Sequence, residues 1–360
     1  MNASMKINIL QAFNGDAIHI NYKDEKGASK NVVIDSGPSS AYSKKGSKGK
    51  AVYGDFFALI TELKRKEEFI DLLIVTHIDD DHINGLLKWI KTDLEADKLI
   101  GQVWFNSGKL IAKHLNEPEN PELEIALTLD ENFETSVKQG ITFESYITDN
   151  GLFLTEIIYA GKELDFGPLH FEFLSPNPQK LSDLLVLWKK EAPDYDTSGG
   201  RGDYTKTLKE LLETDNFVSD TRCANGSSIA FILSYETKKY LFLGDSHPGV
   251  ICEQLKKMNY NESIPLPVEF VKISHHGSAA NTCPGLLKFI ASDHYILSTD
   301  GLQHGHPDKS LIARIIAHNP KCTIRFNYPE LIDYIFSEQD YQDFPDFSTA
   351  GVNDIPMTND

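Results

Sequence analysis

One apolar run that ends abruptly in histidines and aspartates constrains this chain more than any other feature. Residues 71–75 are apolar after the first and are flanked by charge, so the run predicts a short buried strand. His77 and His82 then frame three aspartates at 79–81. Apolar residues recur at helical spacing from Ile83, which predicts a helix that begins near His82. Five metal-ligating side chains are therefore crowded into the six residues of one strand-to-helix turn.

We interpret this turn as a metal-binding site. His77, Asp79 and Asp81 alternate, so an extended backbone would point them the same way, with Asp80 facing away as a solvent-exposed or supporting group. Imidazole and carboxylate groups are common protein ligands of divalent ions. The alternative is a solvated acidic loop that caps the helix. Two histidines around three aspartates are unusual for such a cap.

Three further apolar strands end in the same kinds of residue. They end at Leu243, Ile273 and Leu297, and loops at strand ends commonly carry active sites. The chemically active side chains that follow them are Asp245, His247, His275, His276, His304 and His306. Seven of the twelve histidines lie in these four segments. Together the segments predict a binuclear metal site.

The remaining pattern predicts a mixed α/β fold in which helices cover two sheets, within one large domain at 1–336. Strands are expected at 7–10, 17–22, 31–35, 71–75, 103–105, 152–174, 228–235, 239–243, 268–273, 294–298, 322–326 and 331–336. Helices are expected at 56–63, from about 82, at 180–190, 204–214, up to about 258, at 285–290 and 308–317. Helical insertions are expected at about 108–150 and 177–220, and a loosely packed acidic tail at 337–360.

The charge balance limits the partners of such a chain. Its formal net charge of −18 repels polyanions, so any contact with nucleic acid needs a local basic patch or metal ions. The best candidate for a phosphate-backbone contact is a flexible loop with four lysines, Lys44, Lys45, Lys48 and Lys50. The alternative is a solvated surface excursion, which is the more common role of such runs.

Cysteine usage and hydropathy indicate a cytoplasmic protein. The four cysteines are widely spaced, with no Cys-x-x-Cys pair, which is typical of reduced thiols rather than of a disulfide framework. The first residues lack the apolar core of a signal peptide. No apolar run approaches the roughly 20 residues of a membrane span. We therefore expect no membrane partner.

The motifs resemble those of a known superfamily. The pattern His77-x-Asp79-x-Asp81-His82 resembles the first metal motif of the metallo-β-lactamase superfamily, in the variant where Asp replaces the second His. The set is more similar still to the soluble metallo-β-lactamase-like domain of ComEC-type competence DNA-uptake proteins. That resemblance is carried by residues 13–18, 33–37, 225–228, 272–278 and 304–307. It covers most of 5–330 and implies a four-layer αββα sandwich with helical insertions.

The resemblance also implies a ligand set. His77 and Asp79 would hold one divalent ion. The second would be held by Asp81, His82 and one of the pair His275 and His276, with Asp245 as the bridge. Asn225 stands where many members have a metal-ligating histidine, so the site is rich in oxygen, which favours Mn²⁺ while leaving Zn²⁺ possible. Asp16 and Asp35 are expected to fix turns beneath the site, and His247 to face solvent or to support the site.

Such a site would hydrolyse a phosphodiester, because two ions can activate a water and stabilise the attacking and leaving oxygens. The expected catalytic residues are Asp81, Asn225, His276 and His306. Asn225 would orient the water, and His306 would contact the phosphate or protonate the leaving oxygen. Alternatively, His306 is a loop histidine before a helix-initiating Pro307. Ser278 and His304 are expected to join the lysines in binding substrate.

Three functions remain open at this point. The leading one is a nuclease or phosphodiesterase that acts on DNA or RNA. The second keeps the site but changes the substrate to a small molecule such as a nucleotide, lactone or thioester. The third is a metal-stabilised interaction module, which would dock a protein partner or a second copy of the chain through its helical insertions or acidic tail.

Overall fold

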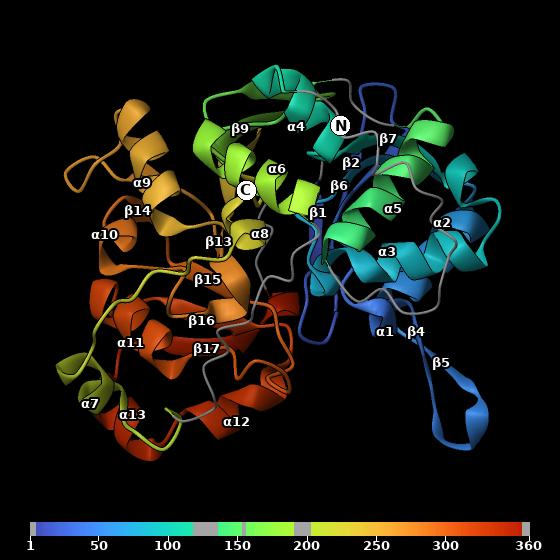
Figure 1. Ribbon diagram of the computed structural model, residues 1–360. Coiled ribbons are helices and arrows are strands. Elements are labelled where there is room, and N and C mark those ends of the chain that lie inside the picture. Colours follow the sequence, from blue (N-terminus) through green and yellow to red (C-terminus); the bar gives the residue numbers. More distant parts are fainter. Residues whose placement is uncertain (1–4, 118–135, 153–155, 191–202, 355–360) are drawn as a thin grey trace.

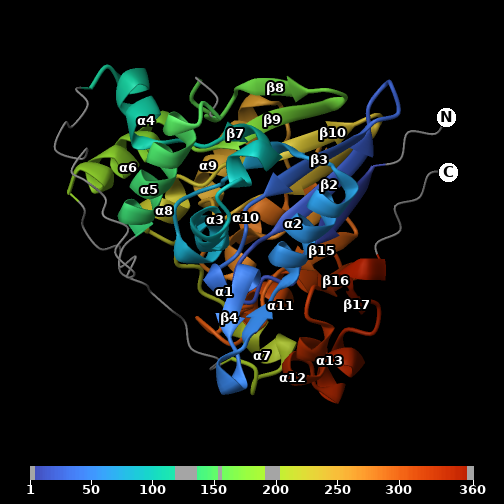
Figure 2. The same cartoon turned by 90° about the vertical axis from the view of Figure 1, so that its right-hand side faces the viewer.

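Two sheets face each other, and helices cover the outer side of each, in the computed structural model of the protein (Figure 1). The structure describes residues 5–117, 136–152, 156–190 and 203–354. The view in Figure 2 shows β2 and β3 of the first sheet beside β9 and β10 of the second. The predicted four-layer αββα architecture is therefore confirmed.

The first sheet has five strands. An antiparallel meander leads into two parallel strands, and the parallel part carries the strand before the histidine-aspartate turn. In spatial order the strands are β1 (Lys6–Ile9), β2 (Ile18–Lys23), β3 (Ser29–Ile34), β6 (Ile70–Ile74) and β7 (Ile100–Trp104).

The second sheet has eight strands, parallel at one end and antiparallel at the other. In spatial order they are β17 (Ser348–Gly351), β16 (Thr323–Phe326), β15 (His294–Leu297), β13 (Val271–Lys272), β11 (Lys238–Phe242), β10 (Ala230–Tyr235), β9 (Leu169–Ser175) and β8 (Glu163–Phe166). Two small sheets pair β4 (Ser43–Lys45) with β5 (Ala51–Tyr53), and β12 (Leu266–Pro267) with β14 (Ile290–Ala291).

The helices form the two outer layers. Over the first sheet lie α1 (Ser39–Tyr42), α2 (Asp55–Lys66), α3 (Asp80–Thr92), α4 (Gly108–Leu115), α5 (Ser136–Asp149), α6 (Pro178–Lys190) and α8 (Cys223–Gly226). The second sheet is covered by α7 (Leu208–Glu213), α9 (Pro248–Lys257), α10 (Pro284–Leu287), α11 (Lys309–His318), α12 (Ile332–Ile335) and α13 (Glu338–Asp343). Short 3-10 turns are η1 (Ser47–Gly49), η2 (Ala96–Leu99), η4 (Ser274–Gly277), η5 (Pro329–Leu331) and η6 (Val352–Asp354).

Three apolar clusters hold these four layers together. The innermost lies between the sheets, where the Phe231 ring packs 5.3 Å from Phe171 and 5.3 Å from Phe242, centroid to centroid. The other two lie between each sheet and its helices. Full burial of one such side chain contributes about 1.5–3 kcal/mol, so the inner cluster binds the sheets firmly.

Several predicted elements differ from those observed. Residues 332–335 form helix α12 rather than a strand, and β13 is only two residues long. The basic loop around residue 47 forms the β4–β5 hairpin. Helix α3 begins at Asp80, so Asp81 lies in its first turn and not in extended backbone.

The predicted loose tail is also wrong for residues 338–351. Helix α13 and strand β17 are integral, because β17 pairs in parallel with β16 and the Asp340 carboxylate accepts a hydrogen bond from buried Lys309 at 2.7 Å. A local excess of charge suggested solvation, but one of these charges, on Asp340, is paired inside the fold.

The described parts of the two predicted insertions contain helices α4, α5, α6 and α7. Helices α5 and α6 bury Phe143 and Trp188 in the cluster over the first sheet, so they form part of the helical layer. The predicted segments at 118–135 and 191–202 lie outside the described residues. Among the described residues, no helix has the length and apolar character needed to cross a bilayer. None of the four cysteines forms a disulfide.

Candidate metal centre

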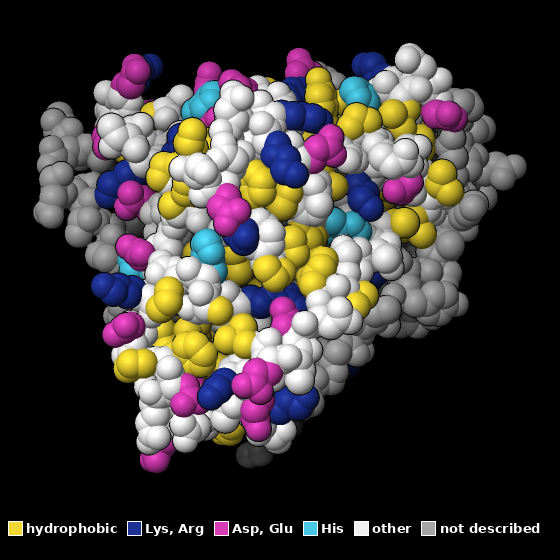
Figure 3. Space-filling model, turned by 90° about the vertical axis from the view of Figure 1, so that its left-hand side faces the viewer, with side chains coloured by type: hydrophobic (Ala, Val, Ile, Leu, Met, Phe, Trp, Pro, Cys, Tyr) yellow, Lys and Arg dark blue, Asp and Glu magenta, His cyan; other side chains and the backbone are white. Residues whose placement is uncertain are grey.

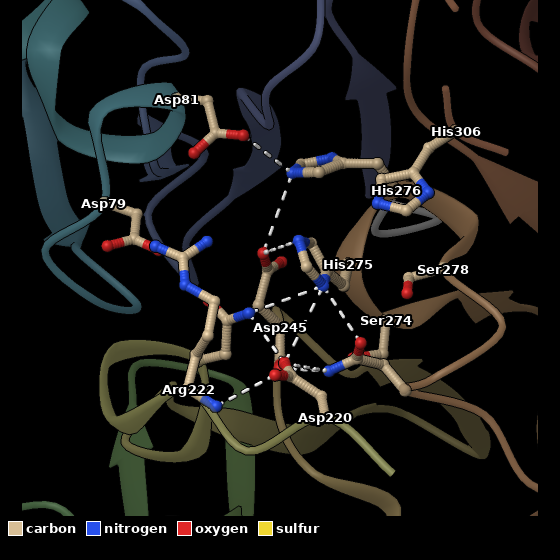
Figure 4. Close-up of polar contacts among 12 residues, drawn as sticks. Asp79, Asp81, Asp220, Arg222, Asp245, Ser274, His275, His276, Ser278 and His306 are labelled. Carbon is tan, nitrogen blue, oxygen red and sulfur yellow. Dashed lines mark hydrogen bonds and ion pairs between the residues drawn. The ribbon is translucent and has the colours of Figure 1, made fainter. Parts of the chain in front are cut away.

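The Asp245 carboxylate is the centre of the candidate site (Figure 4). It is 1% exposed and follows β11. Its Oδ2 atom faces four imidazoles. The distances from this atom to Nε2 are 3.4 Å for His82, 3.7 Å for His77, 3.7 Å for His276 and 3.8 Å for His275.

Strand ends bring these residues together. The turn after β6 supplies one set of side chains, and the loops after β11, β13 and β15 of the other sheet supply the rest. Two glycines permit the close packing beneath. A Cβ at Gly15 would lie 1.9 Å from the Asp81 carbonyl oxygen, and one at Gly85 would lie 2.3 Å from that of Ser36. Larger residues there would push the turn out of place.

Asp35 fixes the turn beneath the site, as expected, and it also orients His82. His82 Nδ1 lies 2.8 Å from Asp35 Oδ2 and donates to it. The same carboxylate accepts from the Thr76 amide at 2.8 Å and from its hydroxyl at 2.7 Å. A carboxylate behind a histidine fixes its tautomer and its ring orientation. His82 Nε2 is therefore held towards Asp245.

Buried polar atoms without partners mark the His77 half of the cluster. His77 Nε2, Asp79 Oδ1 and Asp245 Oδ1 are buried and have no hydrogen-bond partner among the described residues. Burial lowers the pKa of His77 to about 3, so the ring is neutral and its Nε2 lone pair is available. Buried polar atoms in native proteins are normally satisfied, so such a group needs an explanation. A bound cation would supply one.

The two adjacent histidines have distinct surroundings. Both have left-handed backbone conformations, with φ of 49° for His275 and 54° for His276, and such strain is common at functional sites. His276 Nε2 lies 3.2 Å from Asp81 Oδ2 and 3.2 Å from His82 Nε2. His275 Nδ1 instead lies 2.9 Å from Asn281 Oδ1. The geometry therefore groups His276 with Asp81 and His82.

The carboxylates control protonation in this cluster. Burial lowers the pKa of His276, but Asp245 and Asp16 outweigh it and raise the pKa to about 10. Burial also opposes the charge on His82, yet Asp245 and Asp35 raise its pKa well above the usual value. The same negative potential that holds these protons would attract divalent cations.

The donor set fits metal ions. Two triads place one ligand atom from each residue within 4.8 Å of the others, namely Asp16 with His82 and His276, and His77 with His82 and Asp245. Imidazole and carboxylate donors suit both Zn²⁺ and Mn²⁺. The two triads share His82.

A buried network behind the cluster was missed from the sequence. The Asp220 carboxylate accepts from Asn225 Nδ2 at 2.7 Å and from Asn281 Nδ2 at 3.0 Å, and lies 3.5 Å from His247 Nε2. Asn225 Oδ1 has no partner among the described residues. His247 is 5% exposed, so of the two expectations for it, support of the site holds and exposure to solvent does not. Asp220 lies in a polar stretch with no apolar strand before it, so no pattern singled it out.

The sequence did not reveal the contacts that Asp16 and Lys272 make beside the cluster. Lys272 is 1% exposed and forms an ion pair with Asp16, whose other oxygen lies 3.5 Å from His276 Nδ1. The Asp16 amide donates to the Asp81 carbonyl at 3.2 Å. Asp16 therefore connects the His77–His82 turn to His276. It is also one of the residues that could hold an ion.

The remaining predicted residues lie nearer the edge. His306 is 5% exposed, and its ring centroid lies 5.0 Å from that of His275. The Ser278 hydroxyl accepts from the Ala280 amide at 3.3 Å, which is a turn contact. His304 is half-buried with φ of 57°, and exposed Asp80 contacts Gln139 rather than the centre, as expected.

The predicted lysines lie on the β4–β5 hairpin, which projects from the body of the molecule (Figure 1). Lys44, Lys45 and Lys50 are exposed. Lys44 Nζ lies 4.5 Å from the centre of the Phe13 ring. The side chain of Lys48 lies outside the description.

Comparison with known proteins supports a superfamily assignment. The sequence model of the metallo-β-lactamase superfamily matches residues 25–93, the segment that contains the His77–His82 turn. This match and the αββα architecture support membership of that superfamily. No curated protein matches the chain. The ComEC-type subfamily stays a prediction.

Solved structures show only distant likeness. The chain is 13% identical to a CmlA β-hydroxylase E377D mutant, with a TM-score of 0.41, covering 98% of this chain and 52% of that one. It is 9% identical to the metallo-β-lactamase fold protein YhfI from Bacillus subtilis, with a TM-score of 0.41 and coverage of 97% and 95%. The chain thus spans about half the length of the hydroxylase chain.

Proposed function

We propose that this chain is a metal-dependent phosphodiesterase that cleaves nucleic acid. The observation that carries the proposal is the buried cluster in which Asp245 Oδ2 lies within 3.8 Å of four imidazole nitrogens. The superfamily match supports a hydrolytic metalloenzyme. Resemblance of the motif set to a DNA-processing branch supports the phosphodiester substrate.

The residues divide into two half-sites for divalent ions. Asp81, His82 and His276 form one, His77 and Asp79 form the other, and Asp245 is common to both. When bound, the ions would polarise a water and stabilise negative charge on the phosphodiester oxygens.

Two further side chains have places in this reaction. His306 Nδ1 is buried without a hydrogen-bond partner among the described residues, 3.6 Å from the Asp308 carboxylate, and is suited to protonate the leaving oxygen. The Asn225 amide nitrogen is held by Asp220, which leaves its oxygen to accept a hydrogen bond from the attacking water.

The substrate assignment depends on where positive charge lies. On the face over α9, α10 and α11, acidic and basic side chains are interspersed rather than gathered by sign (Figure 3). The lysine hairpin is different, because Lys44 packs on Phe13, whose carbonyl accepts from the Asp300 amide at 2.8 Å. Asp300 begins the loop that carries His306. A nucleic-acid strand on the hairpin would therefore run towards the cluster.

The test is cleavage of single-stranded DNA, double-stranded DNA and RNA by the purified protein supplied with Mn²⁺ or Zn²⁺. We expect cleavage that Asp81→Ala/His82→Ala abolishes. Changing the four hairpin lysines to alanine should weaken binding and flatten its salt dependence, because each phosphate contact contributes about −0.9 to the slope of log affinity against log salt. Lys257→Ala, on the exposed face of α9, is the matched control.

The outcomes separate the alternatives. Absence of metal-dependent cleavage of every nucleic acid would contradict the proposal. Hydrolysis of a small ester or nucleotide at a rate that changes neither with salt concentration nor with the lysine substitutions would favour a small-molecule hydrolase. Loss of stability in Asp81→Ala without any turnover to lose would favour an interaction module.

A further inference from the structure

A guanidinium lies inside the candidate centre, in addition to the Lys272 ammonium that pairs with Asp16. Arg222 Nη2 lies 2.9 Å from Asp79 Oδ2, and the two side chains are 13% and 6% exposed. Figure 4 shows the guanidinium beside the Asp79 carboxylate, on the side of the cluster away from His306. No sequence pattern pointed to this residue.

The backbone holds Arg222 in place. Its amide donates to Asp220 Oδ1 at 2.9 Å, and its carbonyl accepts from the Gly226 amide at 3.0 Å in the first turn of α8. Asp220 is itself fixed by Asn225 and Asn281. The guanidinium therefore approaches Asp79 from a rigid support.

The two halves of the cluster differ in the kind of cation that pairs with their aspartate. Asp81 pairs with His276 and His82, whose imidazole nitrogens are themselves candidate ligands of an ion. A guanidinium stays charged at every accessible pH. An ion in the His77 half must share Asp79 with this fixed charge, and like charges at short range in a buried site repel strongly.

We propose that the centre is asymmetric: one divalent ion binds tightly between Asp81, His82, His276 and Asp245, and Arg222 weakens the binding of a second ion at His77 and Asp79. This inference rests on the proposed function only in that the cluster binds divalent cations. Arg222 supplies part of the positive charge that a second ion would bring.

The experiment measures Mn²⁺ binding by the full chain, with calorimetry for affinity, elemental analysis for stoichiometry and electron paramagnetic resonance for coupled Mn²⁺ pairs. We expect one tightly bound ion in the wild type and a second that binds more weakly by at least about tenfold, or about 1.4 kcal/mol. Arg222→Gln should tighten the second site by a similar factor and produce the coupled-pair signal. Lys180→Gln removes a positive charge beside Gly226 of α8 and should behave as the wild type.

Further variants keep the outcome decisive if Arg222→Gln misfolds. Asp79→Asn should abolish only the weak site, and Asp81→Asn only the tight one. Two sites of equal affinity in the wild type, or a second site that Arg222→Gln leaves unchanged, would overturn the asymmetry. Failure of every form to bind Mn²⁺ would instead overturn the proposed function.

Discussion

The His276 imidazole links protonation to ion binding at the residue scale. Its Nδ1 lies 3.0 Å from the Ser298 carbonyl and donates to it, so Nε2 is directed at Asp81 and Asp245. With a pKa raised to about 10, the ring carries a proton at neutral pH in the ion-free protein. An ion that binds through Nε2 must displace this proton.

We therefore expect the affinity for Mn²⁺ to fall as pH falls from about 9 to about 6, by about tenfold per unit for each proton displaced. Calorimetry in buffers of different ionisation enthalpy should show release of at least one proton, and His276→Gln should release fewer. His170→Gln is the control, because this side chain of β9 is 39% exposed. An affinity independent of pH across this range would refute the link.

The raised pKa of His276 makes the ion-free protein less stable as pH rises, whereas ion binding becomes stronger. A histidine whose pKa is raised on folding stabilises the native state fully below its usual value of 6.5, and that stability is lost as pH rises towards about 10.

At the scale of elements, α13 shows how a charged segment can belong to the core. Burial would raise the pKa of Asp340, but hydrogen bonds from Lys309, Ser337 and Leu208 outweigh it and lower the pKa. The Lys309 and Asp340 side chains are both 0% exposed. The pair connects α13 to α11 and to the start of α7.

Asp340→Ala should therefore lower the free energy of unfolding by roughly 3–5 kcal/mol, because it leaves the Lys309 charge buried without its partner. Since the pKa of Asp340 is lowered on folding, its contribution in the wild type should be present above the usual carboxyl pKa and be lost as pH falls below it. Urea denaturation at several pH values checks both statements. Asp343→Asn, exposed on the same helix, should change stability by less than about 0.5 kcal/mol.

At the scale of the whole molecule, the candidate centre joins the two sheets. His77 and His82 follow β6 of the first sheet, whereas Asp245 and His276 follow strands of the second. The inner apolar cluster lies between the same sheets. Ion binding and the packing of the sheets are therefore coupled in one cooperative structure.

Removing divalent ions with a chelator should lower the melting temperature. An ion at 100 times its Kd stabilises the native state by about 2.7 kcal/mol. Hydrogen exchange should increase together in β6 and β11 when the ion leaves. Asp245→Asn should melt at the same temperature with or without chelator. If the melting temperature of the wild type is also unchanged by the chelator, the ions do not hold the sheets together.

The sequence by itself determined the local features of this protein. Apolar runs followed by His77–His82, Asp245 and His275–His276 identified the strand ends and the ligand types, because period and side-chain chemistry are local properties. They also indicated two sheets covered by helices, whereas the αββα class was implied by the resemblance of the motifs to a known superfamily.

Only the tertiary structure decided which residues meet. Asp220 and Arg222 lie in a segment without a distinctive pattern, and Lys272 lies in a predicted strand that gives no sign of its partner. Their roles come from contacts with Asn281, Asp79 and Asp16, which are far away along the chain. The division between His275 and His276 depends on left-handed backbone conformations that periodicity cannot show. Charge near Asp340 suggested a solvated tail, but burial depends on a partner, Lys309, that local sequence does not reveal.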